Sequence, residues 1–416
     1  MVELLSPGGN FISLRSALEN GADSVYIGLE DNNMRTNTSN FSIDDIKKAS
    51  KIAKEYTSKI YLCTNTMMRD EDIELIESYL PLINEAEIDA LIVSDIGLVD
   101  SAIDNGLDVH ISVQENISNT SALKTFKNLG VKRAILSREL NISEIKKIAN
   151  NSPIETEVFI HGAMCMAISG RCFLSYGFYG KSANCGECLQ PCRKQWKLTV
   201  AQDEDSDFFE KGEDSVILLD KLRDTSYKSN FLSPYDMAMI EHIPEIMDTG
   251  VDAFKIEGRA RSPDYVATTT KVYREAIDSY ETGNYKFNQE WIIDLKKVFN
   301  RGFDTGFYFK EPYKTGGDNK SKFIKKDIGK VVNYYSKIKV AELQIWEDLK
   351  QGDEIIIQGK TTGSINHIIK SMEIDGIAID YCEKGNNVAI AINEKVRPND
   401  FVYKLIKRWI NLISII

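Results

Sequence analysis

The chain has 416 residues, of which 43% are hydrophobic and 27% charged, and this composition excludes a disordered, collagen-like or small disulfide-stapled protein. No apolar run approaches the roughly 20 residues needed to span a bilayer, and residues 1–10 do not resemble a secretory signal, so we expect a cytoplasmic protein with no membrane partner. The net charge of −11 indicates an acidic body that does not attract polyanions from a distance.

Short β-branched runs alternate with amphipathic segments through most of the chain. The runs cover residues 3–5, 24–28, 60–65, 90–94, 108–113, 133–137, 157–161 and 253–257. Eight strand–helix units in series predict a (β/α)8 TIM-like barrel over residues 1–310. The alternative, a doubly wound open sheet, would leave two of these strands unexplained.

A large insertion of about 90 residues precedes the last expected strand. It contains a cysteine cluster and an acidic stretch at residues 203–214, which we expect to be an exposed loop. Residues 311–326 are rich in Gly, Lys and Asn and predict a linker. Residues 327–416 contain short strand-like runs separated by turn residues, which predict a small antiparallel β-barrel. The apolar tail, 401–416, is expected to pack on this barrel or on a second copy of the chain in a homo-oligomer.

Five of the seven cysteines lie within 28 residues of one another: Cys165, Cys172, Cys185, Cys188 and Cys192. In an intracellular chain such clustering indicates metal binding or redox chemistry rather than disulfides. The spacing matches neither a zinc ribbon nor a ferredoxin. Because four thiolates can hold either a zinc ion or an iron–sulfur cluster, the spacing does not choose between them. Cys63 and Cys382 are expected to be buried thiols.

Reactive groups in a TIM barrel lie at the carboxyl ends of the strands. The polar residues at or near those ends are Arg35, Asn65, Asp95, Gln114, Asn116, Arg138, Glu139, His161, Glu257 and Arg259. We expect Arg138 and Arg259 to hold a dicarboxylate through paired hydrogen bonds, and His161 or Glu257 to transfer protons. For each residue there is a structural alternative, in which it only ties a loop, forms an ion pair or braces the cysteine segment.

Two sequence segments, EVFIHGAMC at 157–165 and GRCFLS at 170–175, together resemble in full the signature of the U32 peptidase family. The resemblance extends to ELLSPGGN at 3–10, KIEGR at 255–259 and NRGFDTGF at 300–307, and so covers about residues 1–310. The family includes collagenase-type proteins whose catalytic type was never settled. It also includes proteins that hydroxylate a uridine of tRNA or a cytidine of rRNA, and a pair that hydroxylates ubiquinone precursors without molecular oxygen.

The resemblance implies a [4Fe–4S] cluster, because the hydroxylation members hold one with cysteines of this signature and the segment after it. Carried over by position, the ligands are Cys165, Cys172, Cys188 and Cys192, with Cys185 a spare or substitute ligand. Zinc is the alternative metal. The resemblance further implies hydroxylation of a pyrimidine in RNA, most often tRNA, with prephenate or another small dicarboxylate as the oxygen source.

A peptidase is the alternative function, followed by a small-molecule hydroxylase. The sequence contains no GxSxG elbow and no HExxH motif. His161 and Cys165 are four residues apart and could form a thiol–imidazole pair on a helix. However, His161 lies at an expected strand end, where this spacing does not bring two side chains together.

Two further groups bear on RNA. Residues from 322 onward carry 15 Lys and Arg against 12 Asp and Glu, so the rest of the chain carries −14. We therefore expect RNA to be guided by four lysines of this part, Lys322, Lys325, Lys326 and Lys330, with a solvated linker as the alternative. Four aromatic residues of the insertion are expected to cover the cluster from solvent, with base stacking as the alternative: Phe173, Tyr176, Phe178 and Tyr179.

Overall fold

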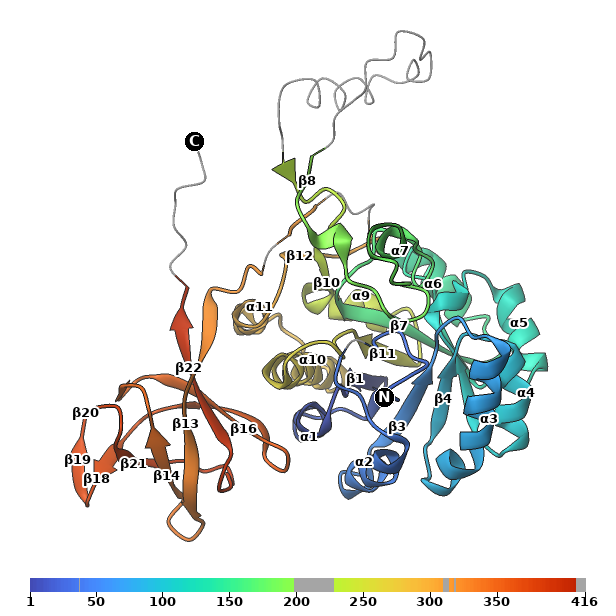
Figure 1. Ribbon diagram of the computed structural model, residues 1–416. Coiled ribbons are helices and arrows are strands. Elements are labelled where there is room, and N and C mark those ends of the chain that lie inside the picture. Colours follow the sequence, from blue (N-terminus) through green and yellow to red (C-terminus); the bar gives the residue numbers. More distant parts are fainter. Residues whose placement is uncertain (37, 198–227, 310–313, 318, 409–416) are drawn as a thin grey trace, which may run out of the picture.

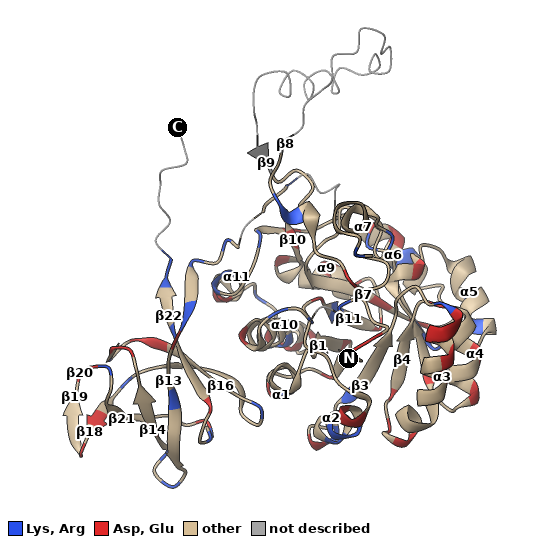
Figure 2. Cartoon of the chain, viewed as in Figure 1, with Lys and Arg blue, Asp and Glu red and all other residues tan. Residues whose placement is uncertain are grey.

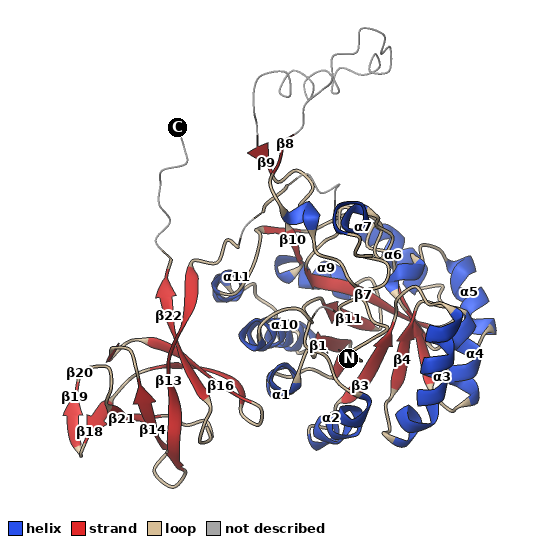
Figure 3. Ribbon diagram, in the orientation of Figure 1, coloured by secondary structure: helices blue, strands red, loops and turns tan. Residues whose placement is uncertain are grey.

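The computed structural model describes residues 1–36, 38–197, 228–309, 314–317 and 319–408. Its first part is a closed barrel of eight parallel strands surrounded by helices (Figures 1 and 3). The barrel strands are β1 (Glu3–Pro7), β2 (Ser24–Gly28), β3 (Lys59–Thr64), β4 (Ala90–Val93), β5 (Asp108–Ile111), β6 (Arg133–Ile135), β7 (Glu155–Gly162) and β11 (Ala253–Ile256). Because β11 pairs with both β1 and β7, the ring closes, and the TIM-like barrel expected from the sequence is confirmed.

The helices between the strands bury one face against the barrel. They are α1 (Phe11–Glu19), α2 (Ile43–Glu55), α3 (Asp70–Glu85), α4 (Gly97–Asp104), α5 (Thr120–Asn128), α6 (Ile142–Ala149), α9 (Ile243–Met247) and α10 (Pro263–Glu281). Several begin at a polar cap. Ser42 and Asn141 each form a capping box with the acidic residue three positions on, which satisfies free backbone N–H groups at the helix start.

Charged side chains inside the barrel are paired. Arg133 Nη2 lies 2.9 Å from Glu3 Oε2, and Arg133 Nη1 lies 3.3 Å from Glu157 Oε2. Glu157 also accepts a hydrogen bond of 2.9 Å from Lys255. Burial alone would raise the pKa of Glu3, but its hydrogen bond and charge interaction with Arg133 lower that pKa to about 2. The buried charges are therefore compensated, as a stable interior requires.

The insertion between β7 and β11 folds over the carboxyl end of the barrel. It contains α7 (Leu174–Tyr179), a short 3₁₀ turn at Pro191–Arg193, and the hairpin of β8 (Trp196–Lys197) and β9 (Lys228–Ser229). β10 (Asp236–Ala238) then runs antiparallel to the end of β7, and β12 (Phe303–Asp304) pairs with β10, after α11 (Gln289–Lys297). The acidic stretch at 203–214 lies outside the described residues.

The last part of the chain is antiparallel β structure, as expected. One eight-stranded sheet has the order β17-β16-β22-β13-β14-β21-β18-β19, and β15 pairs with β20. The strands are β13 (Phe323–Tyr335), β14 (Val340–Ile345), β15 (Leu349–Lys350), β16 (Glu354–Gly359), β17 (Gly363–Ile368), β18 (Met372–Ile374), β19 (Ile377–Ile379), β20 (Tyr381–Cys382), β21 (Asn387–Ala391) and β22 (Phe401–Lys407). β13 begins inside the segment expected to be a linker. The tail beyond residue 408 lies outside the described residues.

Buried apolar residues form two separate clusters, one from Val2 to Tyr308 and one from Ile328 to Val402. Polar contacts join the two parts, including a 2.8 Å ion pair between Lys325 and Asp264 at the start of α10. None of the helices in the described ranges combines the length and apolarity needed to cross a bilayer.

Candidate functional site

A cavity of about 260 Å³ lies at the carboxyl end of the barrel, between the strand ends and the cysteine segment. The strand ends contribute six of the expected pocket residues to its wall: Arg35, Asn65, Gln114, Arg138, Glu257 and Arg259. The cysteine segment contributes Cys165, Cys188 and Cys192. One cavity is therefore lined both by the polar strand ends and by three of the expected ligands.

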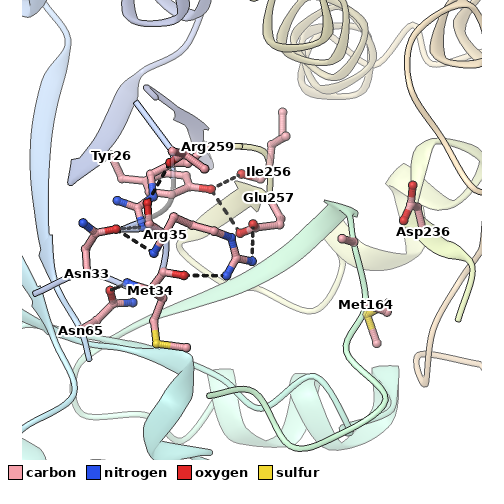
Figure 4. Close-up of polar contacts among 12 residues, drawn as sticks. Tyr26, Asn33, Met34, Arg35, Asn65, Met164, Asp236, Ile256, Glu257 and Arg259 are labelled. Carbon is pink, nitrogen blue, oxygen red and sulfur yellow. Dashed lines mark hydrogen bonds and ion pairs between the residues drawn. The ribbon is translucent and has the colours of Figure 1, made fainter. Parts of the chain in front are cut away.

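Glu257 follows β11 and is the acidic centre of the arginine cluster (Figure 4). Its Oε1 atom accepts a 2.9 Å hydrogen bond from Arg35 Nη2, and its Oε2 atom lies 3.5 Å from the Tyr26 hydroxyl. Burial would raise the pKa of Glu257, but the charges of Arg35, Arg138 and Arg259 outweigh it and lower the pKa to about 2. Glu257 is therefore a carboxylate at neutral pH. In this form it can pair with the arginines, but it carries no proton to donate.

Arg259 is almost fully buried and makes one strong side-chain contact. Its Nη2 atom donates to Asn33 Oδ1 at 2.7 Å, as Figure 4 shows, whereas its Nη1 atom has no partner among the described residues. A Cβ atom at Gly28 would lie only 1.8 Å from Nη1, so glycine at the end of β2 makes room for the guanidinium. A buried cationic N–H group without a partner is costly unless a ligand satisfies it.

Arg138, which follows β6, lies over the ring of Phe159, with its Cζ atom 3.7 Å from the ring centroid. Its Nη1 atom donates to the Ala163 carbonyl at 2.6 Å, and its Nε atom has no partner within the described residues. Arg35 is anchored on Glu257 and on the Met34 carbonyl. Three guanidinium groups therefore face one carboxylate, and the excess positive charge favours a small anion in the cavity.

Asn65 and Gln114 form a hydrogen-bonded pair beside the arginines. Asn65 Nδ2 donates to Gln114 Oε1 at 3.2 Å and to Ser112 Oγ at 3.1 Å. Both residues line the cavity and can present amide groups to a ligand. Asp95 instead accepts a 2.9 Å hydrogen bond from the backbone N–H of Gly97 at the start of α4. This contact fits the structural alternative, in which Asp95 only ties a loop.

Asn116 and Glu139 lie in a neighbouring cavity of about 220 Å³. Arg138 and Cys165 line both cavities and so connect them. Asn116 accepts a 2.7 Å hydrogen bond from Ser137, and no salt bridge joins Glu139 to Arg138 within the described chain. The structure therefore brings these two residues to the edge of the site rather than into the arginine cluster.

His161 does not reach either cavity. The register of β7 against β11 shifts at residue 160, because Phe159 pairs with Lys255 and His161 pairs with Ile256. This bulge interrupts the alternation of side chains and directs His161 outward, against Tyr273, Tyr265 and Phe303. Its Nδ1 atom lies 3.3 Å from the Tyr273 hydroxyl. Burial lowers the pKa of His161 to about 3, so the ring is neutral and positioned to brace the strand.

The five clustered cysteines are free thiols that differ in position. Cys165 is exposed and the other four are half-buried. Burial raises the pKa of both Cys188 and Cys192, whereas the nearby charges of Arg35 and Arg193, respectively, oppose this rise. Neither Cys172 nor Cys185 lines the cavity. In the described part of the chain, no three His, Cys, Asp or Glu side chains are placed to hold a single metal ion. Cys63 and Cys382 are buried, as expected.

Sequence reasoning missed several residues of the site, among them Tyr26, Asn33, Arg193 and Lys255. Lys255 lines the cavity and lies 4.5 Å from the centroid of the Tyr26 ring. Residues 253–257 place this lysine within an otherwise apolar strand. Such a pattern indicates a polar side chain directed into the barrel. Asn33 carries no such signal, because its partner Arg259 is 226 positions away in the chain.

Comparisons with known proteins agree with this architecture. Residues 9–318 match the sequence profile of peptidase family U32. An uncharacterized protease of Methanocaldococcus jannaschii is 46% identical over 97% of this chain and 98% of its own length. A collagenase of Porphyromonas gingivalis is 36% identical over 98% of both chains. The tRNA hydroxylation protein P1 of Bacillus subtilis is 33% identical over 97% of this chain and 94% of its own. The chain belongs to peptidase family U32.

Proposed function

We propose that this protein is a cytoplasmic enzyme that hydroxylates a pyrimidine in RNA, and specifically in tRNA, with the help of an iron–sulfur cluster. The observation that carries the proposal is a single cavity whose wall combines three clustered cysteines with four arginines, Arg35, Arg138, Arg193 and Arg259. A relative named as a tRNA hydroxylation protein, which matches 97% of this chain, supports the choice of substrate.

The proposed ligands of a [4Fe–4S] cluster are Cys165, Cys172, Cys188 and Cys192. A cubane cluster binds one thiolate at each of four separate irons, so its ligands are spread more widely than those around one zinc ion. Three of these four thiols, those of Cys165, Cys188 and Cys192, line the same cavity, which supports placing a cluster there. When bound, the cluster would supply redox chemistry at the cysteine side of the cavity.

The arginines would bind and orient a small dicarboxylate that serves as oxygen donor, for which prephenate is the proposed compound. Arg259 Nη1 and Arg138 Nε are both free to donate within the described residues, and Arg35 is held in place by Glu257. Asn65 and Gln114 offer amide groups that could hold an uncharged base or sugar. The ionised Glu257 would keep the three guanidinium groups together before the anion binds.

The decisive experiment is nucleoside mass spectrometry of RNA from a strain that lacks the gene. We expect one hydroxylated pyrimidine to disappear and to return on complementation with the parent protein, but not with Arg259→Ala. Complementation with Arg261→Ala is the matched control, because Arg261 packs on Phe299 and does not line the cavity. An unchanged nucleoside profile in the deletion strain would reject the proposal.

A peptidase is the second candidate, because relatives 46% and 36% identical are named as a protease and a collagenase. The geometry offers it little support. All four histidines of the chain lie within the described residues, and none lines either cavity with Cys165. Release of labelled peptides from denatured collagen by the parent protein, and its loss in Cys165→Ser, would favour this alternative. Activity on neither RNA nor collagen would favour the small-molecule hydroxylase.

A further inference from the structure

Four aromatic residues of the cysteine segment are largely exposed to solvent. The side chains of Phe173, Tyr176, Phe178 and Tyr179 are 75%, 58%, 54% and 51% exposed, although the sequence favours a role in shielding the cluster. We call these four residues, on and just before α7, the aromatic ridge. Large exposed aromatic groups are unfavourable in water and usually indicate a contact surface.

The segment around the ridge is basic, although the protein is acidic. Residues 163–197 contain five basic residues, Arg171, Lys181, Arg193, Lys194 and Lys197, and one acidic residue, Glu187. This local excess of four positive charges contrasts with the net charge of −11. The ribbon just before β8 is accordingly blue in Figure 2. Three of these cations, Arg171, Lys181 and Lys194, are exposed and could attract a phosphate, which the charge of the first 321 residues does not predict.

The basic side chains near the ridge can reach a phosphate. Lys181 pairs with Glu187 at 2.8 Å and Arg171 approaches Glu115 at 3.9 Å, but the two cations are 53% and 61% exposed. Exposed ion pairs of this kind contribute little and exchange readily for another anion. Lys194 is exposed and forms no ion pair within the described residues.

The ridge is continuous with the candidate site. Ser175 of α7 accepts a 3.1 Å hydrogen bond from the backbone N–H of Leu189, next to Cys188. Phe178 packs against Trp196, with the ring centroids 4.9 Å apart. At the other end of the segment, the exposed Met166 lines the second cavity beside Cys165. Bases held on the ridge would therefore lie close to the entrance of the cavities.

We propose that the aromatic ridge binds the unpaired nucleotides of the RNA substrate by stacking, while Arg171, Lys181 and Lys194 contact their phosphates. The inference rests on the proposed function and adds the mode of substrate binding. Exposed rings together with interspersed cations are the features that bind single-stranded nucleic acid, because every base offers an aromatic face. An apolar protein partner would not need the local positive charge.

The test is fluorescence polarisation of a labelled short single-stranded RNA and of the corresponding duplex, with the parent protein and with Tyr176→Ala/Phe178→Ala. We expect the parent to prefer the single strand, and the double variant to lose at least about 5-fold in affinity per ring removed. Tyr56→Ala is the matched control, because Tyr56 is a partly exposed aromatic residue at the carboxyl end of α2. The control should bind like the parent.

Two readouts separate failure of this inference from failure of the proposed function. Visible absorbance and iron content should be the same in the parent and in the double variant, which shows that the site is intact. Equal RNA affinity of the parent and the double variant would overturn the ridge as a binding surface and leave the proposed function standing. Absence of RNA binding by the parent would reject both.

Charge reversal provides an independent measurement. Lys181→Glu/Lys194→Glu should weaken binding of the single strand and should reduce the slope of log affinity against log salt by about one to two. An unchanged slope would show that these lysines do not contact phosphate and would contradict the proposed path of the strand.

Discussion

The guanidinium of Arg259 donates to Asn33 Oδ1 at 2.7 Å through Nη2 and leaves Nη1 unpaired among the described residues, in a side chain that is only 5% exposed. This contact joins the loop after β2 to the loop after β11. Because Asn33 also accepts a 2.8 Å hydrogen bond from the backbone N–H of Arg35, it fixes both arginines with one carboxamide oxygen. Asn33 is therefore the residue that orients the free donor toward the cavity.

Replacing Arg259 with alanine should reduce turnover by about 10- to 100-fold, which corresponds to the loss of a charge-assisted hydrogen bond. Iron content and the far-ultraviolet circular dichroism spectrum should not change, because the side chain contributes to the cavity wall rather than to the apolar core. Asn33→Ala should also impair the enzyme, by raising KM for the anionic substrate. This variant keeps the Arg259 side chain but removes the carboxamide oxygen that orients it. Normal turnover in Arg259→Ala would show that the residue is structural.

Gly28→Ala should impair the same contact without removing any polar group. The added Cβ atom would lie 1.8 Å from Arg259 Nη1, and the buried guanidinium has little room to move. We expect a loss of about 1–3 kcal/mol in the free energy of unfolding together with reduced activity. Gly177→Ala serves as the control in urea denaturation, because a Cβ atom added at Gly177 would have no other atom within 4 Å. Equal stability of the two variants would contradict this steric explanation.

Strand positions could be predicted from the sequence because β-branched runs bounded by turn residues have one dominant interpretation, and all eight barrel strands are found where expected. The carboxyl-end rule then located Arg138, Glu257 and Arg259 in one cavity. His161 does not line that cavity. Its direction depends on a bulge at residue 160, and a one-residue change of register is not encoded in the local pattern of apolar residues.

Exposure of the aromatic ridge could not be predicted either. A run such as residues 173–179 has the same composition whether its rings pack inward or face solvent, so only the path of the chain decides. The partners of the lysines also depend on tertiary contacts. Lys325 pairs with Asp264 at 2.8 Å in a partly buried setting and is thus less available for RNA than the charge count indicates, whereas the pair of Lys326 with Glu347 is exposed.

Lys325 should stabilise the contact between the barrel and the small β domain rather than guide RNA. Its ammonium group donates to Asp264 and, at 3.0 Å, to Gln358, in a partly buried setting. Lys325→Ala should lower the melting temperature by a few degrees, from a loss of about 1–2 kcal/mol. Lys322→Ala should leave it unchanged, because Lys322 is exposed and forms no ion pair in the described ranges.

The RNA role of the lysines is left mainly to Lys322, Lys326 and Lys330. Their joint reversal to glutamate should weaken RNA binding and reduce its salt dependence, whereas Lys325→Ala should not change the salt slope. Filter binding at several salt concentrations measures both. A larger effect of Lys325 than of these three lysines on the slope would reverse this assignment.

Serine substitution of Cys165, Cys172, Cys188 or Cys192 should remove most of the iron and the visible absorbance of anaerobically purified protein, because an incomplete thiolate set cannot hold a cubane. Cys185→Ser is the control and should retain both, because the family resemblance makes Cys185 only a spare or substitute ligand. Zinc in place of iron in the parent protein would support the alternative metal. Equal iron content in all five variants would reject the ligand assignment.

The ionisation of Glu257 provides a pH-dependent test of the arginine cluster. The pKa of this carboxyl is about 2 in the folded protein, against an ordinary value of 4.5, so the charged form is favoured by folding. A lowered pKa contributes stability that is complete above about pH 4.5 and is lost as the pH falls toward 2. With the side chain only 17% exposed, the contribution is on the order of 3 kcal/mol.

Urea denaturation of the parent should therefore show a steeper loss of stability between pH 5 and pH 3 than that of Glu257→Gln, whose side chain does not titrate. If acid removes a bound cluster, it does so in both proteins. This contribution therefore cancels when the pH dependence of the parent is compared with that of Glu257→Gln. Parallel pH dependences would mean that Arg35, Arg138 and Arg259 do not hold Glu257 in its charged form.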